Sequence, residues 1–192
     1  MDAKADLHRY LRQARVALLG KLDGLSDYDV RRPLVPTGTN LLGLVKHVAA
    51  MAAGYFGETF HRPFPEAVVG LSLADEPNAD MWATADESRD DIIGLWHRAW
   101  SHADATIEAL AVDAPGAVRW WDEEPVTLHL ILVHMLAELN RHAGHADIVR
   151  ELVDGEVGWR SPGDNMVEGD QAWWSAYRER LESTARTFTG AP

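Results

Sequence analysis

The sequence predicts an all-α fold, a four-helix bundle with an additional C-terminal helix. Apolar residues recur with helical periodicity through four long segments, and strand patterns are nearly absent. A stretch that contains three prolines and one glycine, 62–83, separates the second of these segments from the third, as a long crossover connection does in a bundle. With 192 residues, the chain is expected to form a single domain, 1–192, around one core.

Helix-capping residues set the expected boundaries of each helix. The third helix is expected after a cap at Thr84 or Asp86, and the fourth between a cap at Thr127 and a stop at Gly155. A fifth helix is expected to cover one side of the bundle, and residues 116–121 are expected to make a short β excursion. The expected helices span about 4–22, 40–60, 86–110, 128–153 and 171–188.

The composition excludes several classes of function. The chain has 18 Lys and Arg residues against 30 Asp and Glu, a net charge of −12 with no basic cluster, so nucleic acid is not an expected partner. It has no cysteine, which excludes disulfides, zinc ribbons and a thiol nucleophile of its own. No apolar run reaches the roughly 18 residues of a membrane span, and the N-terminus does not resemble a signal peptide. We therefore expect no membrane partner and a cytoplasmic location.

The expected fourth helix carries polar groups on its apolar face. Glu138 and His142 fall at the centre of this face, while His134 and His145 lie along one edge. Burying a carboxylate costs several kcal/mol unless a partner compensates it. The face is otherwise marked by Leu128, Ile131, Met135, Ala146 and Val149.

A metal ion is one such partner. Glu138 and His142 are one turn apart and can point at one ion, and His47, on the shoulder of the apolar face of the second helix, is the candidate third ligand. A His–Glu–His set suits a divalent transition metal with open positions for water or substrate. Alternatively, Glu138 pairs with His142 or Arg141, the histidines bond to backbone carbonyls, and no metal is needed.

Aromatic residues add two further expectations. The loop pair Trp120 and Trp121 either walls a pocket at the open end of the bundle or packs onto the fifth helix. Eight tryptophans exceed what one small bundle needs in its core, so a homodimer is expected. Four other histidines are expected to be solvated: His8, His61, His97 and His102.

Two segments resemble a known family. HMLAELNRHAGHADIVRELVDG (134–155) and NLLGLVKHVAAMAAGYF (40–56) are similar to the DinB-like superfamily, in its small mini-DinB branch. The superfamily shares its fold with bacillithiol transferases and mycothiol-dependent maleylpyruvate isomerase. The resemblance implies an up-down-down-up four-helix bundle with a three-ligand metal site at His47, Glu138 and His142. The family pattern has no residue that corresponds to His145. This histidine is therefore either a fourth metal ligand, a residue that contacts the ligands without binding the metal, or a general base.

Two functions follow from these residues and the resemblance. The first is a metal-dependent enzyme, a thiol S-transferase or isomerase that uses a low-molecular-weight thiol and a small-molecule substrate. The divalent metal, with zinc expected ahead of nickel, iron or manganese, would lower the pKa of a bound thiol or water. In this reading His145 or His134 shuttles a proton, and Trp120 and Trp121 contact the cofactor. The second is a non-catalytic metal- or ligand-binding stress-response bundle.

Overall fold

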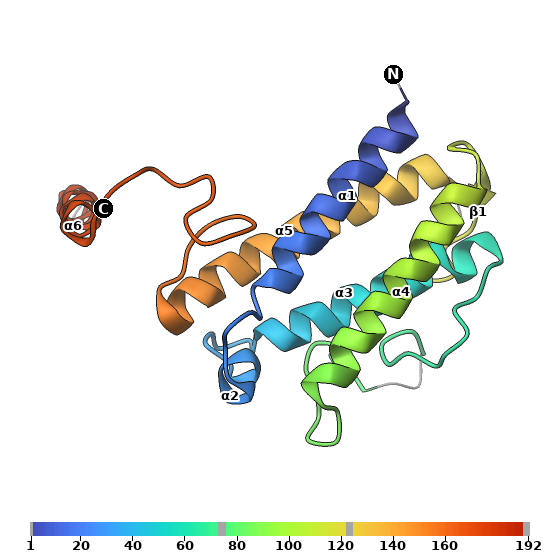
Figure 1. Ribbon diagram of the computed structural model, residues 1–192, viewed down its shortest axis with the longest axis horizontal. Helices are drawn as coiled ribbons and strands as arrows, with labels where there is room; N and C mark the ends of the chain where they lie inside the picture. The colour runs from blue at the N-terminus through green and yellow to red at the C-terminus, as the bar shows by residue number, and fades with distance from the viewer. Residues whose placement is uncertain (1, 73–75, 122–124, 190–192) are drawn as a thin grey trace.

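The computed structural model describes residues 2–72, 76–121 and 125–189 (Figure 1). Most of these residues are helical, which confirms the all-α class. The helices are α1 (Ala3–Gly20), α2 (Asp27–Arg31), α3 (Leu41–Phe56), η1 (Glu58–Phe60), α4 (Arg89–Ala109), α5 (Leu128–Asp154) and α6 (Gln171–Arg186). Two short strands, β1 (Pro115–Gly116) and β2 (Val126–Thr127), lie in the connection between α4 and α5 and pair antiparallel.

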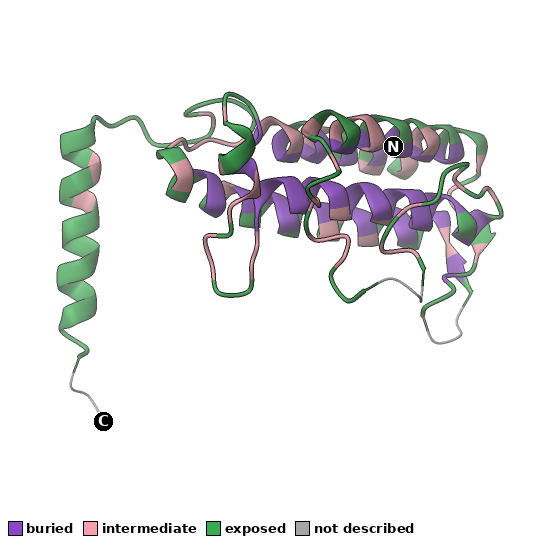
Figure 2. Cartoon of the chain, turned by 90° about the horizontal axis from the view of Figure 1, so that it is seen from below, coloured by how far each residue is buried: buried purple, intermediate pink, exposed green. Residues whose placement is uncertain are grey.

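Four long helices, α1, α3, α4 and α5, lie side by side and bury their facing sides (Figures 1 and 2). Helix α1 packs against α5, and α3 packs against both α4 and α5. In Figure 1, α1 and α5 run in one direction while α3 and α4 run in the other. The α3–α5 contact is what positions the site, because each of these helices carries part of the candidate metal cluster. The largest fully buried side chains of the core include Leu11, Phe56, Ile107, Ile131 and Met135.

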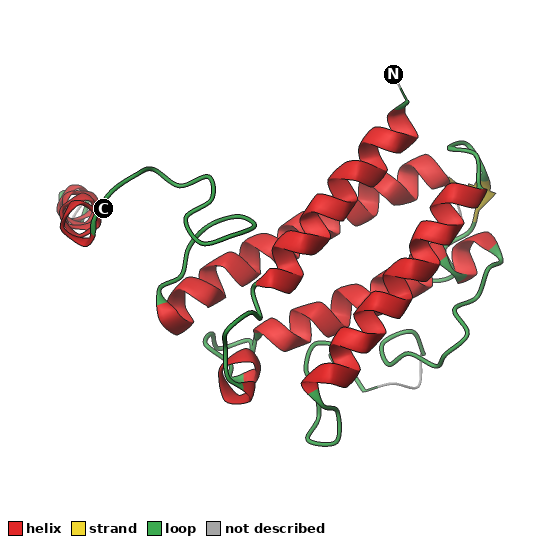
Figure 3. Ribbon diagram, in the orientation of Figure 1, coloured by secondary structure: helices red, strands yellow, loops and turns green. Residues whose placement is uncertain are grey.

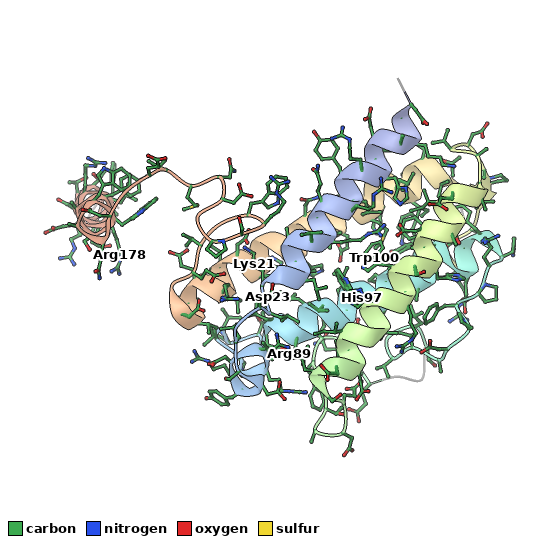
Figure 4. The ribbon with its side chains drawn as sticks, viewed as in Figure 1. Lys21, Asp23, Arg89, His97, Trp100 and Arg178 are labelled. Atoms are coloured by element: carbon green, nitrogen blue, oxygen red, sulfur yellow. The ribbon has the colours of Figure 1, made fainter. Side chains whose placement is uncertain are left out.

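The space between α1 and α4 is closed by an aromatic and a basic side chain. Trp100 of α4 points toward α1 (Figure 4), where the Arg15 guanidinium lies 3.9 Å from the centre of its ring. Arg15 also donates to Asp104 at 2.9 Å, and His8 of α1 lies 2.7 Å from the same carboxylate. His8 is therefore buried, and the expectation that it is solvated is wrong.

The helix boundaries follow from side-chain caps. Thr127 begins α5 and Gly155, with φ of 79°, ends it, both as predicted. Helix α4 begins later than predicted, after Ser88, because Ser88 and Asp91 form a capping box. Thr84 instead donates its backbone N–H to Glu87 within the crossover.

The C-terminal helix departs from the prediction. The expected helix exists as α6, but no residue of it, over Gln171–Arg186, is buried, and it stands away from the bundle (Figure 2). The expectation that it covers one side of the bundle is therefore wrong. Residues 155–170, which connect it to α5, form a loop throughout (Figure 3). The apolar residues of α6 contact one another instead, since the ring of Trp173 stacks on that of Tyr177 at 5.4 Å.

No helix in the described ranges is both long and apolar enough to cross a membrane.

Candidate metal centre

His47 of α3 and Glu138 and His142 of α5 bring their ligand atoms together. One ligand atom from each lies within 4.8 Å of the other two. The Nε2 atoms of both histidines face Glu138 Oε1, at 2.8 Å from His142 and 3.4 Å from His47. A tetrahedral zinc ion with bonds of about 2.1 Å holds its ligand atoms about 3.4 Å apart, so small side-chain movements would admit the ion. The donor set and the spacing both fit a divalent transition metal.

The cluster lies at the edge of the bundle, which gives it access to solvent. The side chains of His142 and His47 are 9% and 15% exposed, whereas that of Glu138 is 27% exposed. Glu138 is thus less buried than its position on the apolar face predicts, because its carboxylate reaches across to His47 at the rim of the α3–α5 contact. The open side of this carboxylate is where a further ligand can approach.

Asp80, which sequence reasoning missed, orients one of the histidines. Its Oδ2 lies 2.6 Å from His47 Nδ1. A carboxylate in this place makes Nδ1 the proton donor and turns the lone pair of Nε2 toward a metal. Such a partner is the usual companion of a metal-binding histidine. Asp80 lies in the crossover loop, where periodicity cannot place a residue.

The crossover loop is fixed onto α3 close to Asp80. Lys46, which is buried beside His47, donates to the carbonyls of Ala79 and Trp82 at 3.0 and 2.9 Å and to the Glu87 carboxylate at 2.8 Å. At Gly43, a Cβ atom would collide with the carbonyl of Met81, so only glycine lets the loop lie this close to the helix. These contacts hold Asp80 against His47.

The charges of the cluster support one another. Burial favours neutral His47, but its hydrogen bonds with Asp80 and Glu138 outweigh burial and raise its pKa. The hydrogen bond with His47 lowers the pKa of Asp80. Burial opposes the ionised form of Glu138, but its hydrogen bonds with His142 and His47 prevail and lower its pKa. Burial lowers the pKa of His142. The carboxylates of Asp80 and Glu138 therefore favour the protonated form of His47, and the imidazole groups in turn favour the ionised carboxylates.

The predicted proton-transfer residues lie on either side of the cluster. His145 is exposed, and its ring centre lies 5.5 Å from that of His142. His134 is half-buried between the rings of Tyr55 and Trp121, at 4.7 and 4.8 Å, and burial lowers its pKa. Neither belongs to the group of three ligand atoms.

The loop tryptophans pack beside the cluster and not on α6. The rings of Trp120 and Trp121 lie 5.1 and 5.6 Å from that of Tyr55, two turns after His47 on α3. The indole N–H of Trp120 also donates to the Tyr55 hydroxyl at 3.3 Å. The tryptophan pair and His134 thus form one aromatic cluster next to the three ligands.

A comparison with protein-family models finds one that matches most of this chain. The mycothiol S-transferase model matches residues 6–155, which span nearly all of α1 and the whole of α2 to α5. The chain belongs to the mycothiol S-transferase family. This assignment confirms the resemblance to the DinB-like superfamily, and the matched range includes the three cluster residues and Asp80. Comparisons with curated proteins and with solved structures found no match.

Asp80→Asn tests the orienting role of this carboxylate in the candidate metal centre. The amide keeps a hydrogen-bond acceptor for His47 Nδ1 but loses the charge, so zinc affinity should fall by about 10–100-fold. Competition titration with a zinc indicator measures this loss. Asp86→Asn, an exposed carboxylate of the same loop, is the matched control and should bind zinc as the wild type does. An unchanged affinity in Asp80→Asn would contradict the assignment.

Proposed function

We propose that this member of the mycothiol S-transferase family joins the sulfur of mycothiol to a small electrophile, at a divalent metal held by His47, Glu138 and His142. Zinc is the expected ion, since two imidazoles and a carboxylate are a common catalytic zinc set. The observation that carries the proposal is the convergence of both histidine Nε2 atoms on Glu138 Oε1. The family to which the chain belongs is described as mycothiol S-transferases, which agrees with thiol transfer at this site.

The residues around the proposed metal have separate roles. Asp80 orients His47, and the open side of Glu138 leaves room for a fourth ligand. When bound, the ion would lower the pKa of a thiol that coordinates it, so that the thiolate is present at neutral pH. The chain has no cysteine, so the sulfur comes from the substrate.

We assign the proton transfer to the two flanking histidines. His134, whose pKa is lowered by burial, is neutral at pH 7 and can accept the proton as the S–H bond breaks. His145, exposed on the other side, is the alternative acceptor. With a substrate such as 1-chloro-2,4-dinitrobenzene, the new S–C bond forms as the C–Cl bond breaks; chloride leaves with the electron pair and the histidine releases the proton to solvent. With an enone, the new S–C bond forms as the C=C electron pair moves to give an enolate, which takes up the proton from the histidine.

Conjugate formation tests this function. The full chain, loaded with zinc, is mixed with mycothiol and a set of electrophiles that includes 1-chloro-2,4-dinitrobenzene and aryl enones. We expect formation of the conjugate faster than in buffer, loss of this acceleration with a chelator, and recovery on adding zinc. A zinc-loaded protein that accelerates none of these reactions would contradict the proposal and favour a non-catalytic metal-binding bundle.

The raised pKa of His47 predicts how metal binding depends on pH. Protons compete with zinc for Nε2 below this pKa, which lies above the ordinary value of about 6.5. Zinc affinity should therefore begin to fall at a higher pH than for a free histidine, by up to about ten-fold per unit. The same group stabilises the metal-free fold below about pH 6.5, and this stabilisation disappears as pH rises through the folded pKa. Zinc titration and unfolding between pH 5.5 and about pH 8.5 measure both effects, and a flat affinity profile would contradict them.

We also propose that the protein acts in the cytoplasm, where thiols are kept reduced, and as a homodimer. Apolar side chains of α6 such as Trp173 and Leu181 remain exposed in the single chain and supply surface for a second copy. Sedimentation should give a species of twice 21.3 kDa at micromolar concentration. A species of 21.3 kDa alone would contradict the dimer.

A further inference from the structure

A cavity lies beside the metal centre, on the side of the loop tryptophans. Its volume is about 460 Å³, within the range of roughly 300–1,000 Å³ that is typical of small-molecule sites. One wall comes from α3, one from the crossover loop and one from the loop before α5. The six lining residues are Met51, Gly70, Leu71, Ser72, Arg119 and Trp120.

Two lining residues of the cavity, Met51 and Gly70, connect it to the metal centre. Met51 follows His47 by four residues on α3, which is one turn or about 6 Å along the helix. Gly70 packs directly on Asp80, because a Cβ atom added to Gly70 would lie 2.6 Å from that of Asp80. Asp80 in turn is bonded to His47. The cavity is therefore connected to His47 through Gly70 and the Asp80 side chain.

The cavity is largely apolar and already shaped. The Trp120 side chain is 40% exposed, yet its indole N–H is bonded to Tyr55, so its ring is held with one part open. A Cβ atom added to Gly54 would lie 2.9 Å from Leu71 and 3.0 Å from Trp120, so both side chains rest tightly on α3. Met51, Leu71 and the ring of Trp120 thus form a preformed surface on which a flat apolar group can stack.

Arg119 is the one charged side chain among the six lining residues. It is exposed at the rim, and one of its N–H groups donates to the carbonyl of Leu71 at 3.2 Å. A guanidinium has five N–H donors, so this bond leaves others for a ligand. An anionic substituent is the group that such a rim would attract.

We propose that this cavity binds the electrophile, and that the electrophile is a planar apolar molecule with an anionic substituent directed to Arg119. This rests on the proposed function. An aryl enone that carries a carboxylate fits the description. As the S–C bond forms at the β-carbon, the C=C electron pair moves to give an enolate, which takes up the proton that the thiol has lost. Nothing is oxidised or reduced, and no further reactant is needed.

Unreactive probes test the cavity apart from catalysis. Calorimetric titration of the full chain, without thiol, uses 2-naphthoate and the neutral 2-naphthylmethanol. Trp120→Ala should weaken both probes by about ten-fold or more, since the ring supplies the stacking surface. Arg119→Gln should weaken 2-naphthoate by about five-fold or more and leave 2-naphthylmethanol unchanged. Trp173→Ala, which removes a tryptophan of α6 that is 41% exposed, is the matched control and should bind both probes as the wild type does.

A second variant and a kinetic measurement make the result decisive. Leu71→Ala should also weaken both probes, which covers the case in which Trp120→Ala is unstable. In turnover, Trp120→Ala should raise KM for the aryl enone and leave KM for mycothiol unchanged. The proposal is overturned if the wild type binds neither probe, if Trp120→Ala and Leu71→Ala bind them as the wild type does, or if KM for mycothiol rises instead. Binding of the probes by a wild type that shows no turnover would support the cavity and reject the proposed function.

Discussion

His47→Ala and His142→Ala are each expected to abolish most of the proposed thiol transfer. Each variant leaves two ligands, which is too few for a catalytic zinc site, and should lower kcat/KM by at least about 10²–10³-fold. The rate is measured with mycothiol and an aryl enone at saturating zinc. The metal-free forms should still fold, because neither imidazole is at the centre of the core.

His97→Ala is the matched control for these two variants. His97 is exposed on α4 and lies outside the cluster, so its removal should leave both zinc binding and the rate unchanged. Full activity in His47→Ala or in His142→Ala would contradict the assignment of ligands.

Glu138→Gln is expected to separate metal binding from stability. The amide keeps the shape of the side chain but loses the charge, so zinc affinity should fall ten-fold or more, about 1.4 kcal/mol. The metal-free protein should change by only about 1 kcal/mol or less, because the Glu138 side chain is 27% exposed and the amide oxygen can still accept from His142. Denaturant unfolding with and without chelator measures the two effects.

The alternative for Glu138 is a purely structural ion pair. In that case the substitution leaves a charge without its partner and costs about 3–5 kcal/mol, equally with and without zinc. Glu151→Gln, an exposed carboxylate of the same helix, should have no effect on either quantity. A large and equal loss in Glu138→Gln would reject its role as a ligand.

Periodicity predicted the long helices, apart from the start of α4, and singled out the three cluster residues. Both ends of α5 follow from Thr127 and Gly155, and the apolar face of that helix singles out Glu138 and His142 as out of place. His47 comes close to these two residues wherever α3 and α5 pack against each other, and most helix pairs in a small bundle are in contact. The burial of Glu138 was overestimated, because the apolar face of one helix does not show how much of that face a neighbouring helix covers.

Other features depend on contacts that a pattern along one chain does not contain. Asp80 reaches His47 only because Gly43 and Lys46 hold the crossover loop on α3. His8 is buried because Asp104 of α4 faces it, although its position near a helix end suggests exposure. The amphipathic pattern of α6 predicts a helix with an apolar side, but not that this side lies apart from the bundle.

Metal content is the most direct test of the central claim, that His47, Glu138 and His142 hold a divalent ion. The full chain is produced without a chelating tag, and its transition metals are quantified by elemental analysis before chelation, after chelation, and after zinc is added back. The structure predicts close to one ion per chain in the first and third samples and almost none in the second. A protein that is purified without any transition metal and takes up none on addition would contradict the account.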